Sequence, residues 1–273
     1  MTSSPGSPGS PGSPGSPGSP DAVPGPPRPR ALTFHGPLGE GRAAELTARL
    51  AAHRPATVLD IGCGWGELML RVLAAVPGAT GTGLDVDEED LARGRALAAG
   101  RGLAGRVEFL AESATGTRRG PADLVLCLGA SQALTGAAPP RLVPEALGEL
   151  RRLVQPGGRV LLAEGFWERP PSPGELAGMW PDAAAGDHPS LAELVDEAVA
   201  AGFRPARIET ATRAEWEEFE SGYREDVEVW LAAHPGHPEA AAVRERTDRQ
   251  RAAWLNGYRN VLGIAYLTLV PQE

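Results

Sequence analysis

One carboxylate and three glycines on alternate positions are the residues whose spacing most clearly indicates chemistry. They lie in the stretch "VLDIGCGWGE", where Asp60 precedes Gly62, Gly64 and Gly66. Glycines at alternate positions let the backbone turn tightly and approach a ligand at places where a Cβ atom would collide. The helix-like pattern that follows offers free N–H groups in its first turn. The segment therefore predicts a ligand held against the backbone where a strand turns into a helix.

Acidic residues near this turn indicate which kind of ligand it holds. A dinucleotide-binding G-x-G-x-x-G pattern needs glycine at position 67, which is Glu67 here. Asp60 would repel a pyrophosphate and attract an ammonium or sulfonium group. Asp85 follows roughly twenty residues after the loop, where a carboxylate can accept hydrogen bonds from both hydroxyls of a ribose. An adenosine with a cationic tail fits these features.

The elements that must position these residues alternate along the chain. Hydrophobic periodicity predicts strands over 56–61, 80–86, 106–111, 122–129 and 159–165. Helices are predicted over 42–53, 67–76, 87–99 and 144–154, with a turn at 156–158 before the fifth strand. Short strands that alternate with helices are typical of a parallel sheet covered on both faces, with ligands at the carboxyl ends of its strands.

The C-terminal third has a different pattern. Capping boxes "SLAE" at Ser190 and "TRAE" at Thr212 predict two helix starts. The first helix is expected over 190–201 and is followed by a strand over 206–210. Two long amphipathic helices, after Thr212 and from Pro238, then precede a last strand over 261–270. We expect these two helices to form a cap over the edge or the mouth of the sheet.

Length and composition favour one enlarged α/β domain over 31–273 behind a Ser/Pro/Gly-rich tail over 1–30, from which no function is expected. No apolar run approaches the roughly 20 residues that span a bilayer, and no secretion signal is found. The two cysteines, Cys63 and Cys127, lie in strand-like surroundings, so neither a disulfide framework nor a metal site is expected. A reducing cytoplasm is the predicted compartment.

The charged residues exclude further classes of function. All 26 basic residues are arginine, so chemistry that needs a Schiff-base, P-loop or kinase-type lysine is excluded. The formal net charge of −9 disfavours a nucleic-acid partner, which needs a concentrated basic face. An acidic cleft would instead suit a cationic ligand.

Five stretches in order resemble the class I S-adenosylmethionine-dependent methyltransferases. They are "VLDIGCGWGE", "GLDVDEEDLARGR", "RVEFLAESA", "ADLVLCLGAS" and "LVQPGGRVLLAEG". The resemblance covers about 32–167, and the remainder matches only as a variable cap. It implies a doubly wound, mostly parallel seven-stranded sheet with a helical cap inserted before the last strand. It also implies a cofactor-binding half over 31–167, a substrate or cap half over 168–273, and S-adenosylmethionine as the cofactor.

The resemblance also implies roles for particular residues. Asp60 would face the ammonium of the cofactor, Asp85 would hold the ribose and Val86 would pack against the adenine. Many members keep an aspartate beside the adenine amino group at the position that is Ser113 here. The sequence leaves open whether the Ser113 hydroxyl or the Glu112 carboxylate makes this contact instead. The remaining residues implied to contact the cofactor are Gly62, Cys63, Gly64 and Gly66 at the turn, Glu112, Ser113 and Ala114 after the third strand, and Leu128 and Gly129 beneath the reactive sulfur.

Transfer of a methyl group from a sulfonium needs the acceptor held in line, and it needs a base only when the acceptor arrives protonated. His35 and Glu164 are the candidate bases, and Gln132 is a candidate for orienting the acceptor. Trp167 and Tyr223 are the candidates for lining the acceptor pocket, which favours a small apolar or aromatic acceptor. Trp216 and Trp230 are expected to pack in the core.

Two alternatives to a methyltransferase stay open at the level of the sequence. One is a protein that binds the cofactor without catalysis, because the glycine turn comes with no assured base. The other is a nicotinamide-dependent oxidoreductase on the same type of sheet, which Glu67 and Asp60 disfavour. The residues do not specify the acceptor atom or the oligomeric state.

Overall fold

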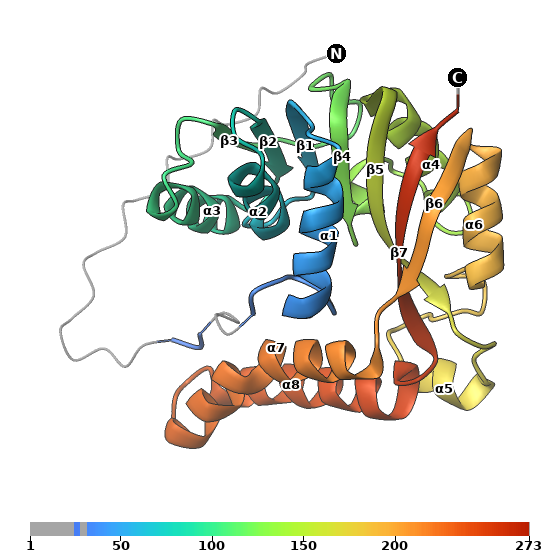
Figure 1. Cartoon of the computed structure of the whole chain (residues 1–273). Coiled ribbons are helices and arrows are strands. Elements are labelled where there is room, and N and C mark those ends of the chain that lie inside the picture. Colours follow the sequence, from blue (N-terminus) through green and yellow to red (C-terminus); the bar gives the residue numbers. More distant parts are fainter. Residues whose placement is uncertain (1–24, 28–31, 273) are drawn as a thin grey trace, which may run out of the picture.

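The computed structural model describes residues 25–27 and 32–272, so the predicted tail lies almost entirely outside the described part of the chain. One seven-stranded sheet runs through the molecule in the order β3-β2-β1-β4-β5-β7-β6 (Figure 1). Its first five strands are parallel, and β7 is antiparallel to both of its neighbours. The predicted doubly wound fold is therefore confirmed. The strands are β1 (Thr57–Ile61), β2 (Thr80–Asp85), β3 (Val107–Ala111), β4 (Ala122–Leu128), β5 (Val154–Trp167), β6 (Phe203–Thr210) and β7 (Leu262–Pro271).

Helices cover both faces of this sheet, so its central strands are apolar on both sides. Successive residues of a strand point to opposite faces, and in β4 Leu124 and Leu126 face one core while Val125 and Cys127 face the other. The first core is closed by α1 (Glu40–Ala52), α2 (Glu67–Ala75) and α3 (Glu88–Gly100). The second is closed by α4 (Leu142–Leu153) and α6 (Leu191–Ala200).

Local signals explain where several elements begin. The capping boxes predicted at Ser190 and Thr212 are both present, and Asp87 caps α3 by accepting from the N–H groups of Glu89 and Asp90. The prediction that a turn at 156–158 precedes the fifth strand is wrong. β5 already begins at Val154, and the Pro-Gly-Gly sequence lies inside it, where the pairing with β4 shifts register and Gly157 has a φ of +75°.

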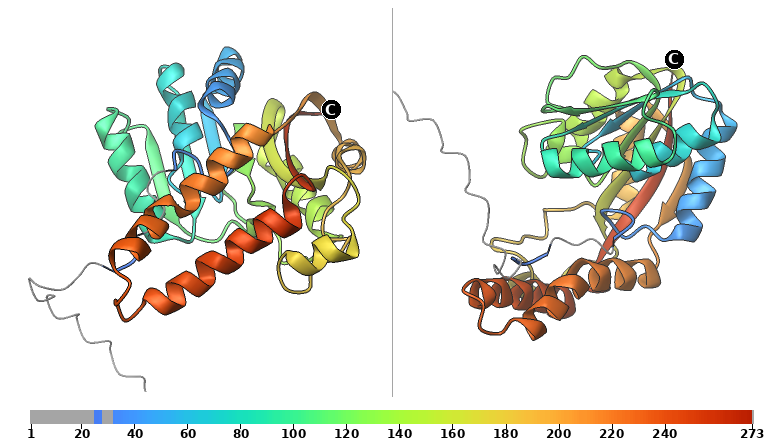
Figure 2. Two further views of the ribbon diagram at one scale, coloured as in Figure 1. Left: turned by 90° about the horizontal axis from the view of Figure 1, so that it is seen from below. Right: turned by 90° about the vertical axis from the view of Figure 1, so that its left-hand side faces the viewer.

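The cap consists of α7 (Arg213–Ala233) and α8 (Ala240–Ala253), which lie side by side beneath the carboxyl ends of the parallel strands (Figures 1 and 2). A π-helical turn, Trp254–Tyr258, and β7 follow α8, while the short α5 (Pro173–Gly178) packs beside that turn. At the far end of the pair a small apolar cluster buries Trp230, as predicted for that residue. The cap is therefore inserted before the last strand, as expected.

A buried ion pair fastens the cap to the body. The Glu215 carboxylate of α7 accepts from Arg42 Nε at 2.8 Å and from the backbone N–H of Gly39 at 3.2 Å. Arg42 also donates to the carbonyl of Thr210 at 2.9 Å. These bonds hold the pKa of Glu215 near 2 against the effect of its burial, because Arg42 and three further donor groups stabilise the charged form. The start of α7 is thus fixed relative to α1.

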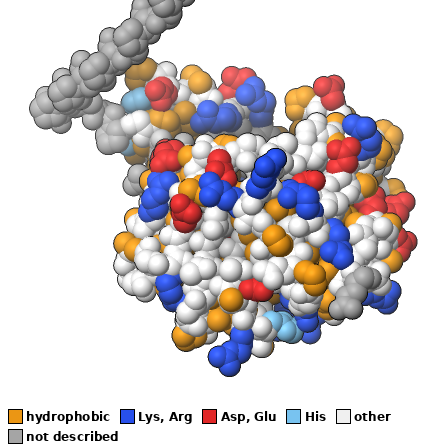
Figure 3. Space-filling view, turned by 90° about the horizontal axis from the view of Figure 1, so that it is seen from above, with side chains coloured by type: hydrophobic (Ala, Val, Ile, Leu, Met, Phe, Trp, Pro, Cys, Tyr) orange, Lys and Arg blue, Asp and Glu red, His pale blue; other side chains and the backbone are white. Residues whose placement is uncertain are grey.

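The surface carries mixed charge. Arginine and acidic side chains are interspersed on the face seen from above in Figure 3. This face gathers no single sign of charge. Within the described ranges, no helix combines the length and apolarity needed to cross a membrane.

Candidate active site

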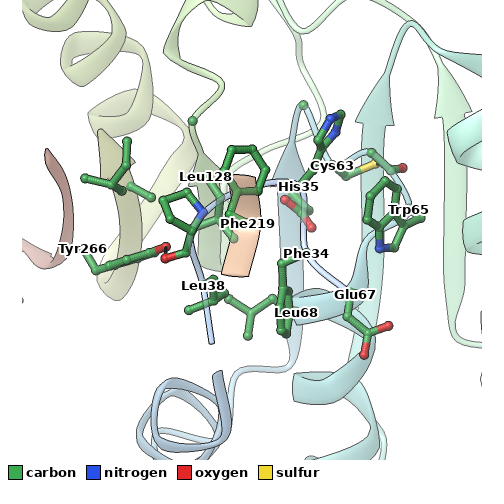
Figure 4. Close-up of a pocket in the computed structure, with 18 of the residues that line it drawn as sticks. Phe34, His35, Leu38, Cys63, Trp65, Glu67, Leu68, Leu128, Phe219 and Tyr266 are labelled. Carbon is green, nitrogen blue, oxygen red and sulfur yellow. Dashed lines mark hydrogen bonds between the residues drawn. The ribbon is translucent and has the colours of Figure 1, made fainter. Parts of the chain in front are cut away.

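A cavity of about 250 Å³ opens at the carboxyl ends of β1, β4 and β5, between the sheet and the cap (Figure 4). The cavity is enclosed by the glycine turn with the start of α2, the segment 34–38 that precedes α1, the ends of β4 and β5, the α7 helix, and β7. Its lining includes Phe34, His35, Leu38, Asp60, Gly62, Gly64, Trp65, Leu128, Gly129, Trp216, Phe219, Ile264 and Tyr266. The cavity therefore joins segments that are far apart in the sequence.

The glycine turn has a backbone that other residues adopt only with strain. Gly62, Gly64 and Gly66 have φ values of +58°, +51° and +65°. At Gly62 the place of a Cβ is also occupied, because the Ala130 methyl group lies 2.4 Å from it. The turn brings β1 into α2 and leaves its own backbone facing the cavity.

Asp60 is a buried carboxyl group at the end of β1, with 4% of its surface exposed. Burial, together with the nearby charge of Asp85, raises the pKa of Asp60 to about 8. A buried carboxylate of this kind is stabilised by a cation. The cavity thus has a specific place for a positively charged group beside a side-chain-free backbone.

Asp85 ties the turn to the end of β2. One of its carboxylate oxygens accepts from the backbone N–H of Gly64 at 2.7 Å, and the other accepts from Val86 at 2.7 Å and Asp87 at 3.0 Å. Val86 follows with 77% of its surface exposed, although it is a large apolar side chain. An apolar surface beside a well-oriented carboxylate suits a nucleoside, whose base is flat and whose ribose offers hydroxyls.

Comparisons with known proteins agree with this geometry. Residues 59–160 match the family model described as "Methyltransferase domain". S-adenosylmethionine-dependent methyltransferases of Thiobacillus denitrificans and Geobacter sulfurreducens, both solved in complex with S-adenosyl-L-homocysteine, superpose with a TM-score of 0.76 and 25% identity. They cover 88% and 90% of this chain, which in turn covers 94% and 98% of theirs. The uncharacterized protein YjhP of Escherichia coli K12 is 28% identical over 241 residues, 88% of this chain and 94% of its own length.

This chain is a class I S-adenosylmethionine-dependent methyltransferase. The assignment replaces the nicotinamide-dependent alternative, and the structure gives a second reason. Glu67 begins α2 in place of the third dinucleotide glycine, and its carboxylate accepts from Arg71 and Arg101, each at 2.8 Å. A glutamate ion-paired with two arginines therefore occupies the position where a dinucleotide-binding protein needs glycine.

Beyond β3, the methyltransferase places the three residues predicted to lie near the adenine in one loop. The Glu112 carboxylate accepts from Arg119 Nη2 at 2.9 Å, and this guanidinium lowers the pKa of Glu112. Ser113 Oγ accepts from the N–H of Thr115 at 3.2 Å. Ala114 is buried. In this structure the Glu112 carboxylate is therefore engaged by Arg119.

Of the three residues predicted for catalysis, His35 is the one that lines the cavity. Its imidazole stacks on the Trp65 ring, with centroids 5.3 Å apart and planes 19° apart. Gln132 is exposed, and its amide donates to the carbonyl of Gly129 at 3.3 Å. Glu164 is buried, but alternation along β5 points it to the α4 and α6 side, opposite the face from which Ala163 lines the cavity.

The residues predicted for the acceptor pocket lie outside the lining. Trp167 is buried against Trp180 and His188, with its indole N–H donating to the carbonyl of Ala185 at 2.9 Å. Tyr223 packs against Phe219 from the next turn of α7, with ring centroids 6.1 Å apart. These contacts keep both rings away from the cavity surface.

Four aromatic residues form the wall that sequence reasoning missed: Phe34, Trp216, Phe219 and Tyr266, called the aromatic wall below. Trp216 was expected in the core, and it does pack against the core edge, yet its ring also lines the cavity. The spacing of Trp216 and Phe219, three residues apart on one helix, was the available signal. For Phe34 and Tyr266 the sequence offers none, since only tertiary contacts bring them together.

The segment 32–38 is fastened across the cavity at several points. Trp65 Nε1 donates to the carbonyl of Thr33 at 2.8 Å, and Arg93, whose guanidinium lies 3.8 Å from the centre of the Trp65 ring, donates to the carbonyl of Leu32 at 2.8 Å. The Tyr266 hydroxyl donates to the carbonyl of Pro37 at 3.0 Å. His35 is therefore held over the glycine turn by its neighbours on both sides.

Proposed function

We propose that this enzyme transfers the methyl group of S-adenosylmethionine to a small apolar acceptor that binds against the aromatic wall. One observation carries the proposal: a single cavity contains the buried Asp60, the glycine turn and the aromatic wall. A carboxylate beside bare backbone suits the cationic methionine end of the cofactor, and the rings suit an apolar molecule. The cofactor and the acceptor would then lie in the same cavity, with no side chains separating them.

In this proposal the cofactor lies along the carboxyl ends of β1 and β2. Asp60 accepts from its ammonium, Gly62, Cys63, Gly64 and Gly66 pass close to its methionine part, and Asp85 exchanges some of its backbone hydrogen bonds for the ribose hydroxyls. Val86 covers one face of the adenine, with Glu112, Ser113 and Ala114 at its edge. Leu128 and Gly129, which line the cavity, lie beneath the sulfonium.

The charges around the cavity argue for an acceptor without an anionic group. Among the described residues that line it, the acidic ones are Asp60 and Glu67, and no arginine is present. Glu67 is already paired with Arg71 and Arg101, and its carboxylate points away from Phe219 and His35 (Figure 4). An acceptor carboxylate or phosphate would thus be desolvated there without a counter-ion, which is costly.

His35 is the proposed base. An imidazole accepts a proton near neutral pH, which a hydroxyl or ammonium acceptor must lose before or during attack on the methyl group. The stacking on Trp65 orients the ring, and His35 lines the cavity over the glycine turn, which supports a role beside the proposed methionine end of the cofactor. Holding the acceptor in line with the methyl group supplies the rest of the rate enhancement, since proximity alone lowers the activation barrier by up to roughly 7–11 kcal/mol.

Titration calorimetry with S-adenosylhomocysteine, followed by an assay of its release from S-adenosylmethionine, tests the proposal. The acceptors are matched sets on one aromatic scaffold: a neutral hydroxyl, an amine and a carboxylate. We expect binding of the cofactor product and release with neutral or amine acceptors at least about tenfold above the carboxylate analogue. Absence of binding would refute the proposal. Binding without release from any acceptor would support a protein that senses the cofactor without catalysis.

The same assay tests the proposed base. His35→Asn keeps a polar side chain of similar reach but cannot accept a proton near neutral pH. With a hydroxyl acceptor we expect turnover to fall by about 10²-fold and to regain activity only as the pH approaches the acceptor's own pKa. An unchanged pH profile would remove His35 from the chemical step.

A further inference from the structure

A buried carboxylate lies on the face of the sheet opposite the cavity. Glu164 of β5 is 8% exposed and points into the core formed with α4 and α6. One carboxylate oxygen accepts from the Ser131 hydroxyl, and the other accepts from the backbone N–H of Gly165 at 2.9 Å. Both oxygens are therefore used inside the protein, away from the proposed reactants.

The partner of Glu164 belongs to the loop that follows β4. Ser131 is 1% exposed and begins the 3₁₀ turn Ser131–Ala133. The residue before it, Ala130, fills the place that a Cβ of Gly62 would take, at 2.4 Å. The same loop includes Gly129, which lines the cavity. Residues 129–133 thus lie between Glu164 on one side and the glycine turn on the other.

A second bond links this loop to the other cofactor segment. Thr115 Oγ1, in the loop after β3, donates to the carbonyl of Ala133 at 3.1 Å. The loop 129–133 consequently touches both the turn proposed for the methionine part and the loop proposed for the adenine. A movement of the loop 129–133 would therefore disturb both of these cofactor-binding segments at once.

Burying a carboxylate at this position costs free energy. Burial raises the pKa of Glu164, and the hydrogen bonds from Ser131 and Gly165 only oppose that rise. Glu197 of α6 and Cys127 of β4 face it from the neighbouring elements. Burial raises the pKa of Glu197, and the charges of Glu193 and Glu164 add to that rise. An apolar side chain of similar size would fill the space at less cost. Packing alone therefore does not explain the residue.

We propose that Glu164 is a positioning residue, which acts through Ser131 to fix the loop 129–133 against the glycine turn. This inference rests on the proposed function, because it assumes that the cofactor lies on that turn. Binding of the cofactor then depends on a bond across the sheet that no reactant touches. Loss of the bond lets the loop move away from Gly62 and widens the cofactor cradle.

Four variants of the full chain test this assignment. Glu164→Leu and Ser131→Ala break the bond, whereas Glu164→Gln keeps it, because an amide can accept from Gly165 and donate to the Ser131 oxygen. Val160→Ala is the matched control: it removes volume from the same core four residues before Glu164 on β5, and its apolar side chain makes no hydrogen bond to the loop. The readouts are S-adenosylhomocysteine affinity by calorimetry, hydrogen exchange of residues 129–134 and the thermal midpoint.

We expect Glu164→Leu and Ser131→Ala to weaken S-adenosylhomocysteine binding about tenfold and to speed exchange of the loop amides. Glu164→Gln should bind within about twofold of the unmodified protein, and Val160→Ala should lower only the thermal midpoint. The inference is overturned if the two bond-breaking variants bind normally, or if Val160→Ala weakens binding as much as they do. Failure of the unmodified protein to bind would refute the proposed function instead, and loop exchange would then decide the positioning role.

Discussion

The two sides of the cavity are built in different ways. The β1 side is one contiguous stretch, Asp60 to Gly66, and presents backbone, three glycines with positive φ and a single buried carboxylate. The cap side is assembled from the segment before α1, from α7 and from β7, and presents aromatic rings. A charged ligand that is bound mainly by the backbone needs only a few side chains, and these lie in a fixed order along the sequence. An apolar ligand needs a pocket of complementary shape, which residues distant in the sequence can form in many ways.

The largest effect should come from Asp60→Asn on the β1 side. Removing one charge of a buried pair costs about 3–5 kcal/mol, so S-adenosylhomocysteine affinity should fall by roughly 2 × 10²- to 5 × 10³-fold. Calorimetry at pH 8 measures it. An effect below about threefold would mean that the ammonium binds elsewhere, and the contrast between the two sides would lose its basis.

The same variant should have the opposite effect on the free protein. Asp60 titrates near 8 when folded and near its ordinary value of 3.8 when unfolded, so between these pH values the folded state binds more protons. The free energy of unfolding therefore falls as the pH rises from about 4 to about 8. Asp60→Asn removes this loss, and urea denaturation at pH 8 should find the variant more stable than the unmodified protein. At pH 4 the two should nearly coincide.

The second effect concerns the backbone of the glycine turn. Gly62→Ala meets both a φ of +58° and the Ala130 methyl group, whereas Gly78→Ala meets a φ of +85° with no atom within 4 Å. We expect a loss of about 2–3 kcal/mol in the free energy of unfolding for Gly62→Ala and about 1 kcal/mol for Gly78→Ala. Urea titrations of both variants provide the comparison. Equal losses would show that strain alone, and not the contact with the β4 loop, makes glycine necessary at position 62.

The difference between the two sides also explains how far the sequence could predict the molecule. Asp60, the glycine turn and the helix caps are local signals, so the sheet and the position of the cofactor segment followed from neighbouring residues. The aromatic wall did not follow, because Phe34 and Tyr266 meet only after the sheet and cap have formed. The same limit applies to Trp216, whose helical spacing is equally compatible with the core and with a cavity.

Glu164 illustrates a further limit of sequence reasoning. Its place at the carboxyl end of β5 was predicted, and ligands do bind at that edge of such sheets. Which face the side chain takes depends on the parity of the strand, and a central strand that is apolar on both faces gives no alternation from which to read it. A shift of one residue along β5 would turn the side chain of Glu164 from the opposite core toward the cavity.

The third effect, on the cap side, distinguishes two neighbouring rings of α7. Phe219 lines the cavity and Tyr223, one turn further along, does not. We expect Phe219→Ala to raise the KM for an apolar acceptor about tenfold, the cost of losing part of a buried ring, with little change in S-adenosylhomocysteine affinity. Tyr223→Ala should change that KM less than about twofold. The reverse order would restore Tyr223 as the acceptor contact and weaken the aromatic wall as defined here.

The smallest effect should come from Val86, which extends the β1 side toward the adenine. A valine with 77% of its surface exposed gains nothing from folding, but it can gain from a ligand that covers it. Trimming it to alanine should weaken S-adenosylhomocysteine binding by about three- to fivefold, near 1 kcal/mol of lost apolar burial, and leave the thermal midpoint unchanged. Val229→Ala on α7 is the matched control, since that side chain is 65% exposed and lies outside the cavity. If both variants bind equally well, the adenine does not rest on Val86, and recognition on the β1 side ends at the ribose.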